Sequence, residues 1–212
     1  MSNPNQHTIF AWIKALFKRN FSRQTSLQDL ANRYLEELCS KKFIYTFQEK
    51  GKKPFTVLIS FDPNAFCHLF SIGSIVKDST PDIDQFSGKK GWQNIQDGTI
   101  TFKLLKQINP SGLSYYANEY DMFDQMVETL KEPQAVKYDP TKVSHSKLAA
   151  DIILFKTFGN RTIHICLSKE PNSTRWFARS YFVRKNDEDK LYPSQYIANM
   201  TPLLVKVSSK NA

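Results

Sequence analysis

Apolar and polar residues alternate along the chain between Ala150 and Arg184, and this alternation predicts an antiparallel meander of strands. The runs Asp151–Phe158, Thr162–Ser168 and Arg175–Arg184 are rich in β-branched and aromatic residues, and turn formers separate them. A fourth strand is expected over Leu203–Val207, after a long connection.

The third run of the meander predicts a strand with two different faces. Strict alternation groups the side chains as Trp176, Ala178, Ser180 and Phe182 on one face, and Arg175, Phe177, Arg179, Tyr181 and Val183 on the other. A face with arginine and aromatic groups suits a phosphate-bearing ligand, because guanidinium groups match phosphate oxygens and rings stack on bases. The plainer interpretation is a half-solvated sheet that binds nothing.

Near the start of the chain the apolar spacing becomes helical. A helix following Thr8 is apolar around much of its circumference, so it could pack on the body, dock on a partner or contact a membrane. Packing on the body is the simplest of the three. A second helix is expected from Ser26, which forms a Ser-x-x-acid cap with Asp29. Its inner stripe is Leu27, Leu30, Ala31, Tyr34, Leu35 and Leu38.

A β-hairpin follows, with strands over Phe43–Phe47 and Phe55–Phe61. Asp62-Pro63-Asn64 then starts a short helix, because Asp62 can cap it and proline at the first turn loses no needed donor. His68 is therefore expected in the first or second turn of this helix, close to the end of a strand.

The middle of the chain predicts further helices around a loop. Residues 77–93 are polar and contain Pro81, Gly88 and Gly91, which favours a mobile loop. A short helical turn over Trp92–Ile95 and helices over residues 99–108 and 120–131 are expected, with a break at Pro110-Ser111-Gly112.

Charge changes this picture, because it is unevenly distributed. The formal net charge is +9. Basic residues outnumber acidic ones by 10 to 4 in residues 1–60 and by 12 to 5 in residues 141–212, whereas acidic residues lead by 11 to 7 in residues 61–140. Two basic segments around an acidic middle favour a polyanion partner or an anionic membrane surface.

Cysteines and short motifs exclude several classes of protein. Cys39, Cys67 and Cys166 are far apart in the sequence and lack metal-ligand spacing. They favour a reducing, cytoplasmic location for the protein. No metal or other cofactor is expected. The N-terminus lacks the pattern of a signal peptide, and no apolar run is long enough to span a membrane. Phosphate-binding loops, dinucleotide fingerprints and the Gly-x-Ser-x-Gly nucleophile elbow are also absent.

The remaining polar groups are sufficient for cleavage of RNA without a metal. In that reaction a base takes the proton of the 2′-hydroxyl, an acid protonates the leaving 5′-oxygen, and fixed cations stabilise the phosphorane. His68 is the candidate base or acid, although a satisfied, partly buried histidine beside Phe66 and Leu69 is the plainer interpretation. His164 lies within a strand, and His7 and His145 lie in polar stretches, so each is expected to be incidental.

Three stretches resemble the phage-associated nucleases of the barnase, EndoU, colicin and RelE-like superfamily. The first is Phe55–Phe61 followed by Asn64-Ala65-Phe66-Cys67-His68-Leu69, similar to a strand and a Phe-x-His-Leu signature. The second is Trp92–Ile100, with its Ile-x-x-Gly-x-Ile pattern, and the third is Ala178–Phe182 followed by Tyr192-Pro193-Ser194-Gln195. The resemblance covers roughly residues 43–207.

The resemblance implies an α+β fold, in which helices pack on a four-stranded antiparallel sheet with an additional N-terminal β-hairpin. Residues 1–41 would form a helical extension and residues 42–212 the nuclease domain. It further implies a metal-independent endoribonuclease, often a toxin in conflicts that involve phages or mobile elements. The competing interpretation is a non-catalytic module that binds RNA or a protein partner.

Functional roles follow residue by residue from the resemblance. His68 would be the base or acid, Ser180 would contact the phosphate, and Tyr192 and Gln195 would position the phosphate or a base. The candidate substrate contacts are Arg179, Arg184, Tyr181, Lys103 and Lys106. The expected partners are RNA, with tRNA as one candidate, and a cognate inhibitor protein. Membrane contact through the first helix is a lesser alternative.

Overall fold

A computed structural model describes residues 26–186 and 194–211 of the chain. The helix predicted after Thr8 and the candidate Tyr192 lie outside these residues. Within them, no helix is both long enough and apolar enough to cross a membrane.

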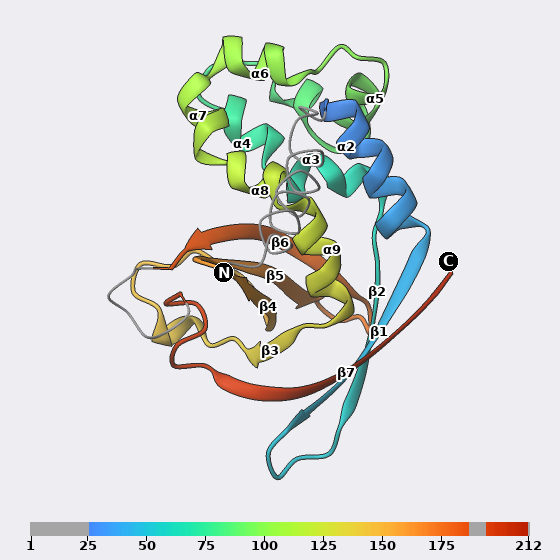
Figure 1. Ribbon diagram of the computed structural model, residues 1–212, viewed down its shortest axis with the longest axis vertical. Coiled ribbons are helices and arrows are strands. Elements are labelled where there is room, and N and C mark those ends of the chain that lie inside the picture. Colours follow the sequence, from blue (N-terminus) through green and yellow to red (C-terminus); the bar gives the residue numbers. More distant parts are fainter. Residues whose placement is uncertain (1–25, 187–193, 212) are drawn as a thin grey trace, which may run out of the picture.

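All strands in the described part of the chain belong to one seven-stranded antiparallel sheet with the order β2-β1-β7-β3-β4-β5-β6. The sheet curls strongly, so that β2 and β6, at opposite ends of this order, contact each other (Figure 1). The strands are β1 (Lys41–Glu49), β2 (Phe55–Ser60), β3 (Gln134–Lys137), β4 (Ile152–Phe158), β5 (Arg161–Lys169), β6 (Trp176–Lys185) and β7 (Thr201–Asn211).

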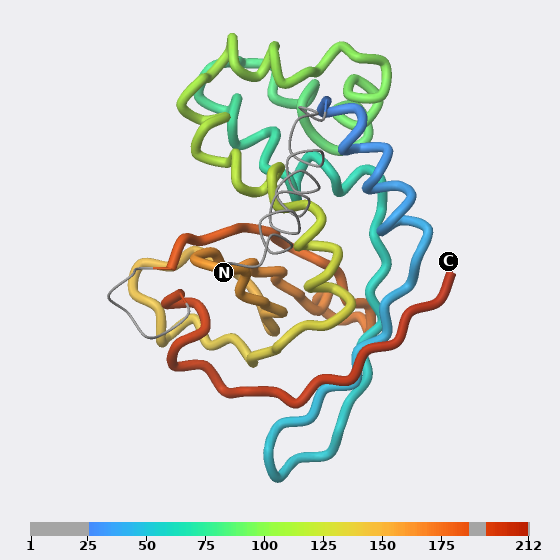
Figure 2. Tube along the Cα trace, viewed as in Figure 1, coloured from blue at the N-terminus to red at the C-terminus, as the bar shows by residue number. Residues whose placement is uncertain are grey.

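The α+β class and the meander are confirmed, but the prediction of a four-stranded sheet was wrong. The last strand, β7, does not extend the meander beyond β6. It pairs with β1 on one side and β3 on the other, so it joins the N-terminal hairpin and the meander into one sheet. Figure 2 shows the turn between β1 and β2 projecting beyond the rest of this sheet.

The helices gather beyond one end of the sheet, except for α9, which descends along it (Figure 1). Their bounds are α2 (Leu27–Tyr34), a π-helical turn (Leu35–Cys39), α3 (Phe66–Leu69), α4 (Ile72–Val76), α5 (Gly88–Gln96), α6 (Phe102–Ile108), α7 (Pro110–Tyr115), α8 (Ala117–Asp121) and α9 (Phe123–Lys131). Single 3-10 turns cover Pro63–Ala65, Ile83–Phe86 and Pro140–Lys142.

The caps of these helices follow from the sequence. Ser26 and Asp29 form the expected capping box at α2, and Asp62 caps the turn that begins at Pro63. The predicted break at Pro110 is instead the start of α7, because Asn109 caps this helix and proline fits its first turn.

The mobile loop predicted over residues 77–93 was wrong in its second half, where a 3-10 turn and α5 form. Gly91 explains part of this result. A Cβ atom there would lie 2.6 Å from the carbonyl carbon of Phe86 and 2.8 Å from Cys67 Sγ. Glycine therefore allows α5 to approach α3 and the 3-10 turn closely, and tertiary packing stabilises a helix that its composition disfavours.

Two apolar clusters lie on the two faces of the sheet. The larger cluster fills the space between the helices and the inner face, and it includes the ring of Tyr34, which packs edge-on against Phe61 and Phe66. Helix α2 thus shares the main core, and the domain division at residue 41 stays a prediction. The smaller cluster covers the outer face of β3, β4, β5 and β6 beneath residues 138–150 and 194–200.

Candidate active site

A β-bulge interrupts β6 beside the short helix α3. Cys166 of β5 pairs with Ser180, and the next residue, Leu167, pairs with Ala178, so Arg179 is the extra residue on β6. The backbone carbonyl of Arg179 is therefore available outside the ladder to β5. The Nε2 atom of His68 lies 2.6 Å from this carbonyl oxygen.

This contact determines which nitrogen of His68 carries the proton. A carbonyl oxygen only accepts hydrogen bonds, so Nε2 is the donor and Nδ1 holds the lone pair in the neutral ring. The His68 side chain is exposed, while its neighbours Cys67 and Leu69 are buried and anchor α3 in the core. His68 thus presents a proton-accepting nitrogen on a helix that is fixed on both sides.

A cavity of about 210 Å³ adjoins His68. Its walls supply one cation, Lys77, and the hydroxyl-bearing residues Ser71, Ser74 and Ser87. Ser71 has a left-handed backbone, with φ of 57°, which turns the chain sharply between α3 and α4. Lys77, at the end of α4, lines the same cavity as His68. Cys67 also lines the cavity, but burial raises the pKa of its thiol to about 12, so it is not a thiolate nucleophile.

The bulge also corrects the predicted faces of β6. It inverts the alternation, so Trp176 and Ala178 share the helix-facing side with Tyr181 and Val183, while Ser180 lies beyond the bulge on the outer face with Phe182. The prediction that Tyr181 belongs to an open, ligand-facing surface was wrong. Its side chain is 3% exposed, and its hydroxyl donates to the backbone carbonyls of Glu119 and Met122.

A second polar group, on the outer face of the sheet, surrounds His164. The Nε2 atom of this buried histidine lies 2.5 Å from Ser194 Oγ, and its ring stacks on Phe182 with centroids 4.6 Å apart. Burial, together with the charge of Arg184, lowers the pKa of His164 to about 3, so the ring is neutral near pH 7. The guanidinium of Arg184 lies over the other ring of the stack, 4.8 Å from the centroid of Phe182.

The predicted site residues therefore fall into separate groups. His68 meets only the backbone carbonyl of Arg179 at the edge of β6, and Arg179 is not among the residues that line the cavity. Ser180, Arg184 and the exposed Gln195 belong to the outer face around His164. Lys103 and Lys106 are exposed on α6, in the part of the helical layer far from the sheet (Figure 1).

Sequence reasoning missed three features of these sites. The carbonyl of Arg179 was missed because backbone acceptors have no sequence signature. Lys77 was missed because its position depends on the turn at Ser71. The pairing of His164 with Ser194 was missed because it joins segments 30 residues apart. The placement of His164 inside a strand, opposite Phe182, was the available signal for a buried histidine.

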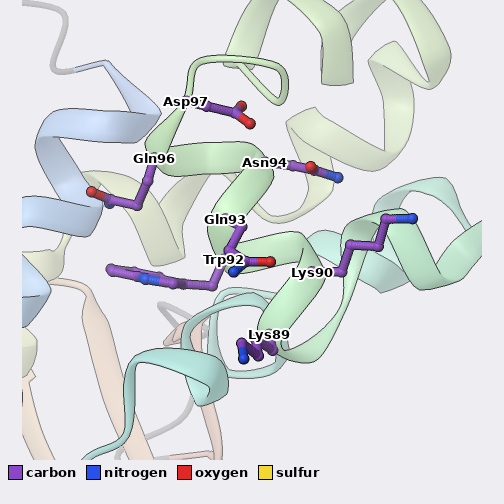
Figure 3. A pocket seen from close by; sticks show the side chains of 7 residues that line it. All are labelled: Lys89, Lys90, Trp92, Gln93, Asn94, Gln96 and Asp97. Atoms are coloured by element: carbon purple, nitrogen blue, oxygen red, sulfur yellow. The ribbon is translucent and has the colours of Figure 1, made fainter.

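A wider depression of about 930 Å³ lies over α5, but its side chains diverge. Figure 3 shows Trp92 and Gln96 pointing to one side of the helix while Lys90 and Asn94 point to the other. The Trp92 ring packs toward the core against Tyr34 and Phe66. In the part of the chain that the structure describes, no group of three or more His, Cys, Asp or Glu residues could hold a metal ion.

Comparison with known proteins places the chain in a family. No curated protein and no solved structure matches it. The model of one family, described as phage-Barnase-EndoU-ColicinE5/D-RelE like nuclease4, matches residues 26–201. The match spans α2 through the start of β7 and confirms the family resemblance. The chain therefore belongs to this family of phage-associated barnase, EndoU, colicin and RelE-like nucleases.

Proposed function

We propose that this nuclease is a metal-independent endoribonuclease whose reaction centre is His68 and the adjoining cavity. The observation that carries the proposal is the bond from His68 Nε2 to the Arg179 carbonyl, because it leaves Nδ1 of an exposed ring as a proton acceptor. This arrangement is what abstraction of a 2′-hydroxyl proton requires.

The proposed reaction needs only RNA and this chain. His68 Nδ1 takes the proton of the 2′-hydroxyl, and the resulting oxygen attacks the neighbouring phosphorus. The bond from phosphorus to the 5′-oxygen then breaks, which leaves a 2′,3′-cyclic phosphate. The charge of Lys77 stabilises the phosphorane, and Lys77 then donates a proton to the leaving oxygen. The cavity's serine hydroxyls hold the non-bridging oxygens.

The second candidate is an RNA-binding module in which His68 is purely structural. The same hydrogen bond favours this alternative, because it gives His68 a task in holding the bulge of β6 against α3. Incubation of the purified protein with total RNA and a chelator distinguishes the nuclease from the binding module. Discrete fragments with 2′,3′-cyclic phosphate ends support the nuclease, whereas intact RNA despite salt-sensitive binding supports the module.

A toxin role, with tRNA as substrate and a cognate inhibitor protein as partner, is the biological setting that we propose. Its support is membership of a family of phage-associated nucleases and the net charge of +9, which suits a polyanion. Expression in a bacterial host should arrest growth and produce tRNA fragments. Arrest without cleaved RNA would contradict this setting.

A further inference from the structure

The outer face of β2, β1 and β7 is a basic surface without acidic side chains. Along these strands the inward positions hold buried residues such as Phe43, Tyr45 and Ile59, so the alternate positions face outward. The hydroxyls of Thr46 and Thr56, 3.3 Å apart, confirm that outward neighbours on β1 and β2 lie side by side. None of the outward positions on the three strands is Asp or Glu.

The register aligns the lysines of this surface across the strands. Lys42 is opposite Ser60 of β2 on one side and Lys210 of β7 on the other, and Lys206 is opposite Thr46. Like charges directly opposite each other destabilise a sheet. Among the ion pairs of the described residues, none involves Lys42, Lys206 or Lys210. Folding therefore gains nothing from this juxtaposition, whereas binding of a polyanion would.

The surface also carries apolar side chains and leads toward His68. Leu58 is 48% exposed and Leu204 is 73% exposed, and both lie at outward positions among the lysines and hydroxyls. Lys42, Lys210 and Ser60 occupy the end of the strands nearest the helices (Figure 1). From Ser60 the chain continues through Pro63–Ala65 into α3, which bears His68.

We propose that this outer surface of β2, β1 and β7 is the docking surface for single-stranded RNA, with the phosphates on Lys42, Lys206 and Lys210. Bases pack against the exposed leucines and the hydroxyls bind sugar and phosphate oxygens. The RNA strand leaves this surface at Lys42 and enters the cavity beside His68. This inference rests on the proposed function for its choice of polyanion, since alternating lysine and hydroxyl groups specify phosphate rather than sequence.

The test compares two triple variants with equal charge changes. Lys42→Gln/Lys206→Gln/Lys210→Gln removes the surface, and Lys89→Gln/Lys90→Gln/Lys131→Gln removes three exposed lysines from α5 and α9. Binding of a fluorescent oligouridylate is measured between about 50 and 200 mM salt. The slope of log affinity against log salt should fall by about 2 in the first variant, as expected for three lost contacts to single strands. The control variant should retain nearly the wild-type slope, and neither variant should melt earlier than wild type, since the first one relieves the like-charge pair of Lys42 and Lys210.

The outcomes separate this inference from the nuclease assignment. Equal losses in the two variants would overturn the docking surface. So would loss of binding to phosphatidylserine vesicles with RNA binding unchanged, which would identify a membrane surface. Wild-type protein that binds through these lysines but never cuts RNA would refute the nuclease and leave the docking surface standing. Cleavage of RNA by the first variant with the wild-type KM would overturn the docking surface and leave the nuclease assignment standing.

Discussion

The carboxylate of Glu119 accepts a hydrogen bond from the backbone N–H of Val183 at 3.3 Å. Val183 lies on β6, which ends the strand order of the sheet, so a buried side chain from α8 supplies an acceptor where a further strand would otherwise do so. The second carboxylate oxygen of Glu119 is buried without a hydrogen-bond partner among the described residues.

Glu119 should make stability depend on pH. Burial raises the pKa of this carboxyl, so the folded state holds the proton more tightly than the unfolded chain does. Its contribution is complete below the unfolded pKa of about 4.3 and is lost as pH rises through the folded pKa. Relative to wild type, Glu119→Gln should therefore gain free energy of unfolding as pH rises from about 4 to 7. Urea denaturation at several pH values measures this.

The matched control for that experiment is Glu36→Gln, which changes an exposed glutamate on the π-helical turn. It shows what the loss of one surface carboxylate does to the same denaturation curves. A shift in the free energy of unfolding of Glu119→Gln that does not change with pH would contradict the assignment.

His164 should give a pH dependence of the opposite sign. Its folded pKa of about 3 lies below the ordinary value of about 6.5, so the unfolded chain binds the proton more readily. Stability from this group is present above about pH 6.5 and is lost as pH falls toward 3, by up to about 1.4 kcal/mol per unit. His164→Gln, which cannot titrate, should flatten this part of the curve. An unchanged acid limb would show that His164 is hydrated in solution.

His68→Gln separates the chemical role of His68 from its structural one. The glutamine amide can still donate to the Arg179 carbonyl, but it offers no basic nitrogen. RNA cleavage should fall by roughly 100-fold or more, while the melting temperature and RNA affinity stay near wild type. His68→Ala, which loses the tether as well, should also melt earlier. A folded His68→Gln protein that cuts RNA at the wild-type rate would remove His68 from the mechanism.

Lys77 should matter more for the reaction than the lysines of α6. Lys77→Gln should lower kcat by roughly 100-fold, the usual cost of removing one group that stabilises transition-state charge. Lys103→Gln should leave kcat unchanged, because Lys103 lies on α6, far from the sheet (Figure 1). Single-turnover cleavage at saturating protein makes the comparison. Equal rates for the two variants would place the reaction outside the cavity.

Gly91 and Gly73 offer a matched pair for the packing of α5. Gly91→Ala places a methyl group against Phe86 and Cys67, and it should cost about 1–3 kcal/mol of stability. At Gly73 the nearest atom to an added Cβ is 4.0 Å away, so Gly73→Ala should stabilise the protein by about 0.4–1 kcal/mol. Denaturant midpoints measure both. If Gly91→Ala is neutral, the close approach of α5 is not needed.

The strands of the meander could be predicted because each combines period-two alternation with flanking turn residues. β3 could not, since Gln134–Lys137 is only four residues long and has no turn signal of its own apart from Pro133. The bulge at Arg179 was equally hidden, because one extra residue shifts the phase of alternation without changing composition. For this reason Tyr181 was predicted on the wrong face of β6.

The candidate site shows the same division between local and tertiary information. His68 was predicted as a functional residue from its motif and its place after a strand. Its hydrogen-bond partner could not be predicted, because the Arg179 carbonyl becomes available only through the bulge. The role of Lys77 could not be predicted either, because its position depends on the left-handed turn at Ser71. Helix α5 could not be predicted because it depends on the close contacts at Gly91, which no helix-propensity scale includes.

The position of β7 also has a consequence for folding on the ribosome. β7 follows all the other strands in the chain, yet it lies between β1 and β3 and supplies the hydrogen bonds that connect the hairpin to the meander. During synthesis the hairpin and the meander cannot be joined into one sheet until residues 201–211 have emerged from the ribosome. Such distant pairing is slow to form, so the chain should acquire its complete sheet, and with it the continuous lysine surface, only once β7 is free to pair with both neighbours.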